Sequence, residues 1–122
     1  MANELVLIVD DNEKNRKLAR DVLRHAGFRT VEAGTGGDGV LLAAEQMPDL
    51  VLMDIRLPDM DGTEAVRQLK ADERTARIPV VALTAVAMTG DRERFLEDGF
   101  DDYLEKPINV REFGDQIRSR LR

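Results

Sequence analysis

Three short, continuous runs of apolar residues stand out along the chain, at residues 5–9, 50–53 and 80–83. They are rich in β-branched side chains and do not alternate with polar residues, which is typical of parallel strands buried on both faces of a sheet. Two weaker runs, at residues 29–32 and 102–104, mix apolar with charged positions and predict strands nearer a sheet edge. The pattern therefore predicts five strands.

Helical spacing of apolar residues follows each predicted strand. In the first helix Leu18 and Val22 share one face, with Ala19 and Leu23 beside them, and we expect Gly27 to mark the end. Asp61 and Glu64 have capping-box spacing at the start of the third helix. The buried stripe of the last helix is predicted to be Val110, Phe113, Ile117 and Leu121. The predicted helices cover residues 14–25, 38–46, a segment from 61, residues 90–98, and a segment from 109.

Strands and helices alternate along the whole chain. This order predicts the α/β class, a (βα)5 doubly wound, five-stranded parallel sheet with right-handed crossovers and helices on both faces. The length of 122 residues fits one domain. We therefore expect residues 1–122 to form a single domain, with no linker and no second, output domain.

Composition narrows the classes of partner. The chain is 43% hydrophobic and 34% charged, and its formal net charge of −6 disfavours direct binding to nucleic acid. It has no cysteine, which excludes disulfides and thiolate chemistry. The first residues lack the basic region of a signal peptide, and no apolar stretch approaches the ~18 residues of a membrane helix. We expect a cytoplasmic protein that does not bind membranes.

Polar residues gather where the predicted strands end. Asp10 and Asp11 follow the first strand, Asp54 ends the third, Thr84 ends the fourth, and Lys106 lies just past the fifth. Ligands of open α/β sheets bind beyond the carboxyl ends of the strands, at the point where the strand order reverses. If the first and third strands are neighbours, about 4.8 Å apart, their terminal carboxylates can share one small ion.

This set of residues suits phosphoryl chemistry. Clustered carboxylates repel one another, and a hard divalent cation, Mg²⁺ rather than Zn²⁺, would relieve that repulsion. A carboxylate beside such an ion can attack an activated phosphorus and form an aspartyl phosphate. Thr84 could donate a hydrogen bond to one phosphoryl oxygen, and Lys106 could offset the charge on another.

The motifs resemble those of two-component response-regulator receiver domains, over essentially the whole chain and with the family spacing. They are Asp10-Asp11, Leu50-Val-Leu-Met-Asp54, Leu57-Pro-Asp-Met-Asp-Gly62, Val81-Ala-Leu-Thr-Ala85 and Tyr103-Leu-Glu-Lys-Pro107. The segment from Met88 to Arg94 is similar to that of single-domain regulators of the chemotaxis and cell-division kind.

The resemblance implies a role for each matched residue. Asp54 would be the phosphoacceptor. Asp10, Asp11, Asp54 and the backbone carbonyl of Arg56 would hold Mg²⁺ or Mn²⁺. Thr84 and Lys106 would contact the phosphoryl group.

The resemblance also implies the switch and its partners. Thr84 and Tyr103 would be the switch pair, the Lys106–Pro107 peptide bond would be cis, and the fold would be flavodoxin-like with strand order 2-1-3-4-5. A sensor histidine kinase or histidine phosphotransfer protein would be the phosphodonor. A downstream protein target would read the surface formed by the fourth helix, fifth strand and fifth helix, with the chain a monomer or a phosphorylation-dependent dimer. The chain would be a regulatory switch rather than an enzyme.

Other interpretations remain open at this point. Taken singly, Asp10 and Asp11 could cap a helix, Asp54 could form a turn, and Lys106 could be a solvated charge. An aspartyl-phosphate-forming phosphatase would need a second acid two residues after Asp54, where the chain has Arg56.

A nucleotide-binding flavodoxin-like module would depend on residues 34–39, which satisfy G-x-G-x-x-G. These residues follow the weak, edge-like strand, and we expect no bound nucleotide. We expect the glycines to serve a loop that needs positive φ.

Overall fold

The computed structural model describes residues 3–85 and 91–121, and its strands and helices alternate as predicted. Part of the segment from Met88 to Arg94 therefore lies outside the described residues. The elements are β1 (Leu5–Val9), α1 (Glu13–His25), β2 (Arg29–Ala33), α2 (Gly36–Gln46), β3 (Leu50–Asp54), α3 (Gly62–Ala71), β4 (Val80–Thr84), α4 (Asp91–Asp98), β5 (Asp102–Glu105) and α5 (Phe113–Arg120).

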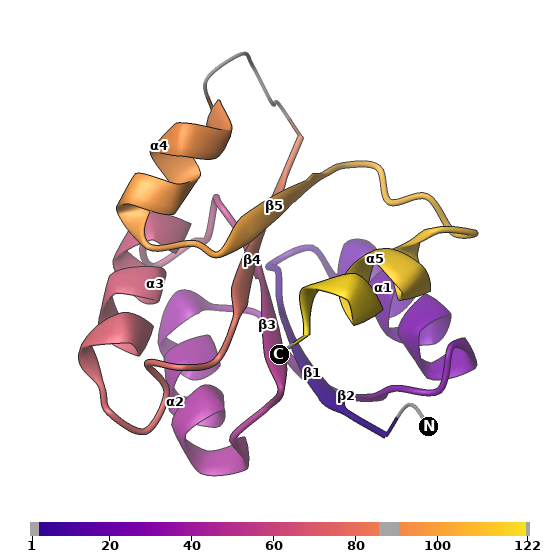
Figure 1. Ribbon diagram of the computed structural model, residues 1–122, viewed down its shortest axis with the longest axis horizontal. Helices are drawn as coiled ribbons and strands as arrows, with labels where there is room; N and C mark the ends of the chain where they lie inside the picture. Colours follow the sequence, from indigo (N-terminus) through magenta and orange to yellow (C-terminus); the bar gives the residue numbers. More distant parts are fainter. Residues whose placement is uncertain (1–2, 86–90, 122) are drawn as a thin grey trace.

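The five strands form one parallel sheet with the order β2-β1-β3-β4-β5, which confirms the predicted topology (Figure 1). β1 lies inside the sheet, where it pairs with β2 on one side and with β3 on the other. The chain therefore reverses its direction across the sheet between these two neighbours. This reversal places the carboxyl ends of β1 and β3 at the switch point, where α/β sheets bind ligands.

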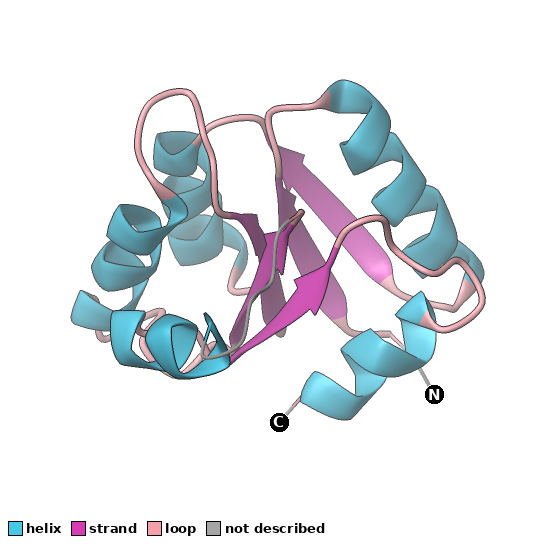
Figure 2. Ribbon diagram, turned by 90° about the horizontal axis from the view of Figure 1, so that it is seen from above, coloured by secondary structure: helices cyan, strands magenta, loops and turns pink. Residues whose placement is uncertain are grey.

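Helices cover both faces of the sheet (Figure 2). α1 and α5 lie on one face, and α2, α3 and α4 lie on the other (Figure 1). Right-handed crossovers explain the faces of the connecting helices α1 to α4, because reversing the direction of strand addition moves the connecting helix to the opposite face. In the parts of the chain that the structure describes, no helix is long and apolar enough to span a bilayer.

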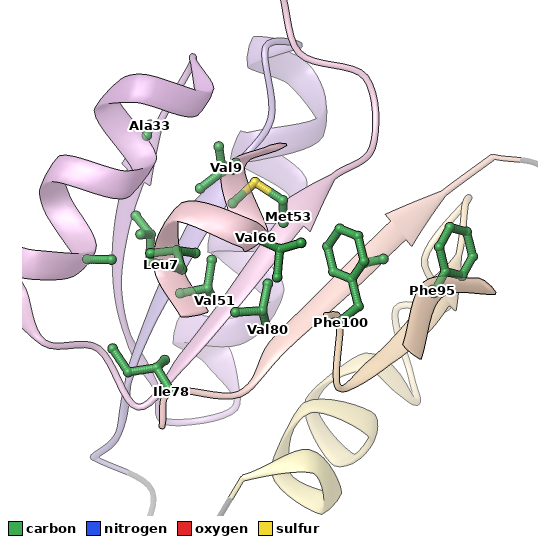
Figure 3. Packing of buried hydrophobic residues seen from close by; sticks show 14 residues of the cluster. Leu7, Val9, Ala33, Val51, Met53, Val66, Ile78, Val80, Phe95 and Phe100 are labelled. Carbon is green, nitrogen blue, oxygen red and sulfur yellow. The ribbon is translucent and has the colours of Figure 1, made fainter. Parts of the chain in front are cut away.

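Side chains of the three central strands alternate between two buried clusters. Leu7, Val51 and Val80 point toward α2, α3 and α4, where they pack with Phe95 and Phe100 (Figure 3). The positions between them point toward α1 and α5. That second cluster contains Val6, Ile8, Leu50, Leu52, Val81, Leu83, Ala19, Leu23, Phe113 and Ile117. Every residue of these central strands is buried, as their continuous apolar runs predict.

The buried face of α1 centres on two of the four apolar residues that helical spacing brings together. Ala19 and Leu23 are buried, whereas Leu18 is 43% exposed and Val22 only partly buried. Adjacent apolar stripes on one helix compete for the sheet, and the small Ala19 permits the closer approach. The predicted end is confirmed, since Gly27 has a φ of 99°.

The last helix also begins differently. α5 starts at Phe113, and Asn109 instead caps the turn before it, its Oδ1 accepting from the amides two and three residues on, at 3.0 and 3.3 Å. Phe113 and Ile117 are fully buried, and Leu121 packs against the same cluster. Val110 is 58% exposed because it lies in the turn rather than on the helix.

Two other local predictions are wrong in detail. Asp61 precedes α3, but its side chain makes no capping hydrogen bond, so the predicted capping box is not formed. The glycines of residues 34–39 have no positive φ. They provide space instead: a Cβ on Gly36 would lie 2.5 Å from Met60 Cγ, and one on Gly39 would lie 2.8 Å from Val9 Cγ2.

Candidate functional site at the switch point

The predicted polar residues meet at the carboxyl edge of the sheet. Asp10 follows β1, Asp54 is the last residue of β3, and β1 and β3 are direct neighbours. Oxygen atoms from the carboxylates of Asp10, Asp11 and Asp54 all lie within 4.8 Å of one another. The structure therefore brings together the three acids that the sequence predicts to share an ion.

Asp10 is held so that one oxygen faces the site. Its side chain is buried, and its Oδ1 accepts a hydrogen bond from the Asn12 amide at 2.9 Å. Its Oδ2 lies 3.4 Å from Nζ of Lys106 but accepts no hydrogen bond from the described residues. A buried carboxylate oxygen that no donor approaches within hydrogen-bonding geometry has room for a second cationic partner besides Lys106.

Asp54 is buried beside that oxygen. Its Oδ2 lies 3.2 Å from Nζ of Lys106, and its Oδ1 accepts a longer bond of 3.3 Å from the Arg56 amide. Burial raises the pKa of Asp54, and the negative charge of Asp10 raises this pKa further. The nearby Lys106 opposes both effects without cancelling them. The site thus holds more negative charge than one lysine compensates.

These residues fit a hard divalent cation. All three candidate side chains offer oxygen, the ligand atom that Mg²⁺ and Mn²⁺ prefer, and no sulfur or imidazole is among them. Asp11 is exposed, so an ion could reach the cluster from solvent and keep bound water. Arg56 lies in the loop after β3, two residues from Asp54, where a backbone carbonyl could join the set.

Thr84 and Lys106 come from the ends of adjacent strands. Thr84 is buried at the end of β4, and its carbonyl accepts a hydrogen bond of 2.7 Å from the Lys106 amide. The following Lys106–Pro107 peptide bond is cis, as the family resemblance implies. Lys106, just past the last strand, has its Nζ 3.4 Å from Oδ2 of Asp10 and 3.2 Å from Oδ2 of Asp54.

Tyr103 lies on β5, away from the acid cluster. Its ring is partly buried and packs against Phe95 of α4, with the ring centroids 5.4 Å apart and the planes tilted by 49°. Tyr103 therefore connects the last strand with the fourth helix.

Asp59 is a residue that the sequence reasoning did not single out. Its two carboxylate oxygens accept hydrogen bonds from the amides of Gly36 and Gly37, each at 2.8 Å, at the start of α2. These bonds lower the pKa of Asp59. The helix terminus that a nucleotide phosphate would need thus already binds a carboxylate of the same chain. No local signal reveals this contact, because its partners lie 22 and 23 residues apart.

Comparisons with known proteins agree with this geometry. The response regulator receiver domain family matches residues 6–118. The polar-differentiation response regulator DivK of Brucella ovis is 47% identical over 116 residues, covering 95% of this chain and 94% of that protein. DivK of Brucella anthropi is 46% identical over the same shares.

Solved structures show the same fold. The receiver domain of a sensor histidine kinase from Pseudomonas aeruginosa PAO1 is 39% identical, with a TM-score of 0.87 over 98% of each chain, and its structure has a magnesium ion coordinated in the active site cleft. Chemotaxis protein CheY4 of Vibrio cholerae, at 24% identity, matches with a TM-score of 0.91 over 98% of this chain and 100% of its own. With its sheet order, its strand-end residues and this family match, the chain belongs to the response regulator receiver domain family of two-component signalling.

Proposed function

We propose that this chain is a phosphorylation-controlled switch, in which Asp54 accepts a phosphoryl group from the phosphohistidine of a sensor histidine kinase or a histidine phosphotransfer protein. The observation that carries the proposal is the burial of Asp54 beside the open oxygen of Asp10 and the ammonium of Lys106. The domain assists its own phosphorylation and dephosphorylation, and its role is regulatory rather than enzymatic.

Asp10, Asp11, Asp54 and the Arg56 carbonyl would hold Mg²⁺ or Mn²⁺. When bound, the ion neutralises the clustered carboxylates and the charge of the incoming phosphoryl oxygens. The open Oδ2 of Asp10 and the all-oxygen ligand set support this assignment.

The transfer itself exchanges one bond for another. A carboxylate oxygen of Asp54 forms the O–P bond while the P–N bond to the donor imidazole breaks, and the imidazole nitrogen retains the electron pair and takes a proton. The hydroxyl of Thr84 donates a hydrogen bond to one phosphoryl oxygen, and Lys106 offsets the charge on another. The donor's chemistry supplies the activated phosphorus, so this chain mainly has to position it and compensate its charge.

The signal leaves the site through β4 and β5. Thr84 and Tyr103 form the switch: when Thr84 moves toward the phosphoryl group, Tyr103 turns inward. Because Tyr103 packs against Phe95, this turn changes the contact between β5 and α4. A downstream protein then reads the α4–β5–α5 surface, in the cytoplasm, with the chain a monomer or a phosphorylation-dependent dimer.

The competing functions have less support. A phosphatase with an aspartyl nucleophile lacks its second acid, since Arg56 occupies that position. A nucleotide-binding role would need the amides of Gly36 and Gly37, which donate to Asp59.

A phosphorylation experiment tests the proposal. Incubation with acetyl phosphate and Mg²⁺ should add one acid-stable, base-labile phosphoryl group, detected by mass spectrometry, and Asp54→Asn should abolish the labelling. Asp61→Asn is the matched control, because Asp61 is an exposed acid of the following loop, and it should label like the wild type. Full labelling of Asp54→Asn would refute the assignment.

A further inference from the structure

Arg16 reaches from α1 to the backbone of the acid cluster. Its Nη1 donates a hydrogen bond of 2.7 Å to the carbonyl of Asp10, and its Nε lies 3.5 Å from Oε1 of Glu32 on β2. The side chain is largely buried, with 21% of its surface exposed. One guanidinium thus joins the turn after β1 to the edge strand.

The carbonyl that Arg16 binds belongs to the peptide between Asp10 and Asp11. The orientation of this peptide sets the direction of both acidic side chains. Asp10 is fixed elsewhere by its amide, which donates to the Ala33 carbonyl at 3.1 Å, and by its Oδ1, which binds the Asn12 amide. The backbone carbonyl of Asp10 accepts its hydrogen bond from Arg16. The Oδ2 atom of Asp10 is then left without a hydrogen-bond donor from the described residues.

Gly34 leaves space for this contact. A Cβ at Gly34 would lie 3.3 Å from Arg16 Nη1, closer than ordinary van der Waals contact. Gly34 is also the first glycine of the G-x-G-x-x-G pattern. The space that a side chain at Gly34 would fill is therefore used by the guanidinium of Arg16 rather than by a nucleotide phosphate.

We propose that Arg16 is a positioning residue for the divalent-cation site, holding the Asp10–Asp11 peptide so that both carboxylates face one ion. This inference rests on the proposed function, because it assigns a role toward the ion required there. Arg16 contacts the Asp10 backbone and Glu32, and so acts on ion binding through Asp10 rather than on the phosphoryl group. Its removal should weaken ion binding while leaving the transfer step intact once the ion is bound.

Arg20 provides a matched control. It lies one helical turn further along α1, and its Nη1 donates to Oε2 of the same Glu32 at 3.2 Å. Both Arg16→Ala and Arg20→Ala remove a cationic partner of Glu32, but only the first removes a donor to Asp10. In calorimetric titrations with MgCl₂, Arg16→Ala should raise the dissociation constant roughly 10-fold or more, the usual effect of losing a residue that orients a metal ligand. Arg20→Ala should bind Mg²⁺ like the wild type, and equal weakening in both variants would overturn the proposal.

A kinetic measurement separates positioning from catalysis. The rate of phosphorylation by acetyl phosphate, followed against Mg²⁺ concentration, should show an apparent Mg²⁺ constant raised by the same factor, with an unchanged rate at saturation. A lower rate at saturating Mg²⁺ would contradict a positioning role.

If Arg16→Ala does not fold, Arg16→Met carries the test, because it keeps the aliphatic packing but has no donor. A wild-type chain that neither binds Mg²⁺ nor becomes phosphorylated would refute the proposed function. A wild-type chain that does both, alongside a folded Arg16→Met variant with unchanged Mg²⁺ affinity, would refute only the role of Arg16.

Discussion

Lys106 lies between two buried carboxylates, 3.4 Å from Asp10 and 3.2 Å from Asp54. One positive charge therefore faces two negative charges where water has limited access. Burial is the largest cause of the raised pKa of Asp54, and repulsion from Asp10 is the next. In the absence of a divalent ion, ionised Asp54 should thus lower the stability of the fold.

Replacement of Asp54 by Asn should therefore stabilise the protein in EDTA. At neutral pH the urea concentration at the midpoint of unfolding should rise, because the variant has no carboxylate to ionise at this buried position. A raised pKa means that the folded state holds its proton more tightly, so the wild type loses stability as pH rises above the unfolded value of about 3.9. The difference should vanish below that pH.

Mg²⁺ provides the control for this prediction. If the proposed site binds Mg²⁺ in the folded state, excess Mg²⁺ should stabilise the wild type and should have much less effect on Asp54→Asn. If the variant were less stable than the wild type in EDTA at neutral pH, the ion pair with Lys106 would outweigh the cost of burial.

At the scale of elements, the β3–α3 loop is fastened to the start of α2. Asp59 binds the amides of Gly36 and Gly37, and Met60 packs where Gly36 lacks a side chain. The same loop carries Arg56, whose carbonyl is the proposed further ligand. The contact with α2 therefore constrains a segment that belongs to the site.

Asp59→Ala should lower the thermal unfolding temperature at neutral pH, because two amides at the start of α2 lose their acceptor. The pKa of Asp59 is lowered by these bonds, so their stabilisation is present above the unfolded pKa of about 3.9 and is lost as pH falls. The difference from wild type, measured by circular dichroism, should therefore shrink in acid. Asp61→Ala is the matched control, since Asp61 precedes α3 without a side-chain capping bond. Equal destabilisation by both substitutions would argue against a specific role for Asp59.

The elements also show which local features the sequence could predict. Strand positions followed from continuous apolar runs, since burial on both faces leaves a strong signal. In α1, periodicity identified two adjacent apolar stripes without deciding that the one with Ala19 and Leu23 packs against the sheet. The glycines before and within α2 were misinterpreted because the side chains that need their space, Met60 and Val9, lie far away in the sequence.

On the scale of the whole molecule, the carboxyl ends and the amino ends of the parallel strands carry different interactions. The acids and Lys106 lie at the carboxyl edge. At the opposite edge, Lys70 Nζ donates to the Ile78 carbonyl at 2.8 Å and to Asp101 Oδ2 at 2.9 Å, and Asp101 also accepts from the Val80 amide at 2.8 Å. This network joins α3 to the starts of β4 and β5. We therefore expect a substitution in the Lys70 network to lower the stability of the fold without changing the phosphorylation rate.

Lys70→Met should lower the free energy of unfolding by roughly 1–3 kcal/mol, because it removes charge-assisted hydrogen bonds to partly buried acceptors. The rate of phosphorylation by acetyl phosphate should be unchanged at temperatures where the variant is folded. Arg67→Met, an exposed change on the same helix, should alter neither the urea midpoint nor the rate. A loss of phosphorylation in the folded Lys70 variant would show that the two edges are coupled.

The sequence could predict that the site residues meet, because the carboxyl ends of parallel strands lie together on one side of the sheet. Asp10, Asp54 and Lys106 met as expected for that reason. Arg16 and Asp59 could not be predicted in the same way, since their contacts depend on how a helix and a loop lie against neighbours that the strand pattern does not specify.

The position of Lys106 after the last strand has a consequence for a chain emerging from the ribosome. The carboxylates at residues 10 and 54 are synthesised early, but their ammonium partner arrives only when β5 pairs with β4 at the sheet's edge. A nascent chain that has assembled its first four strands thus carries the acids without the lysine. Competence to receive a phosphoryl group should then appear only after β5 has paired with β4 and brought Lys106 to the acids.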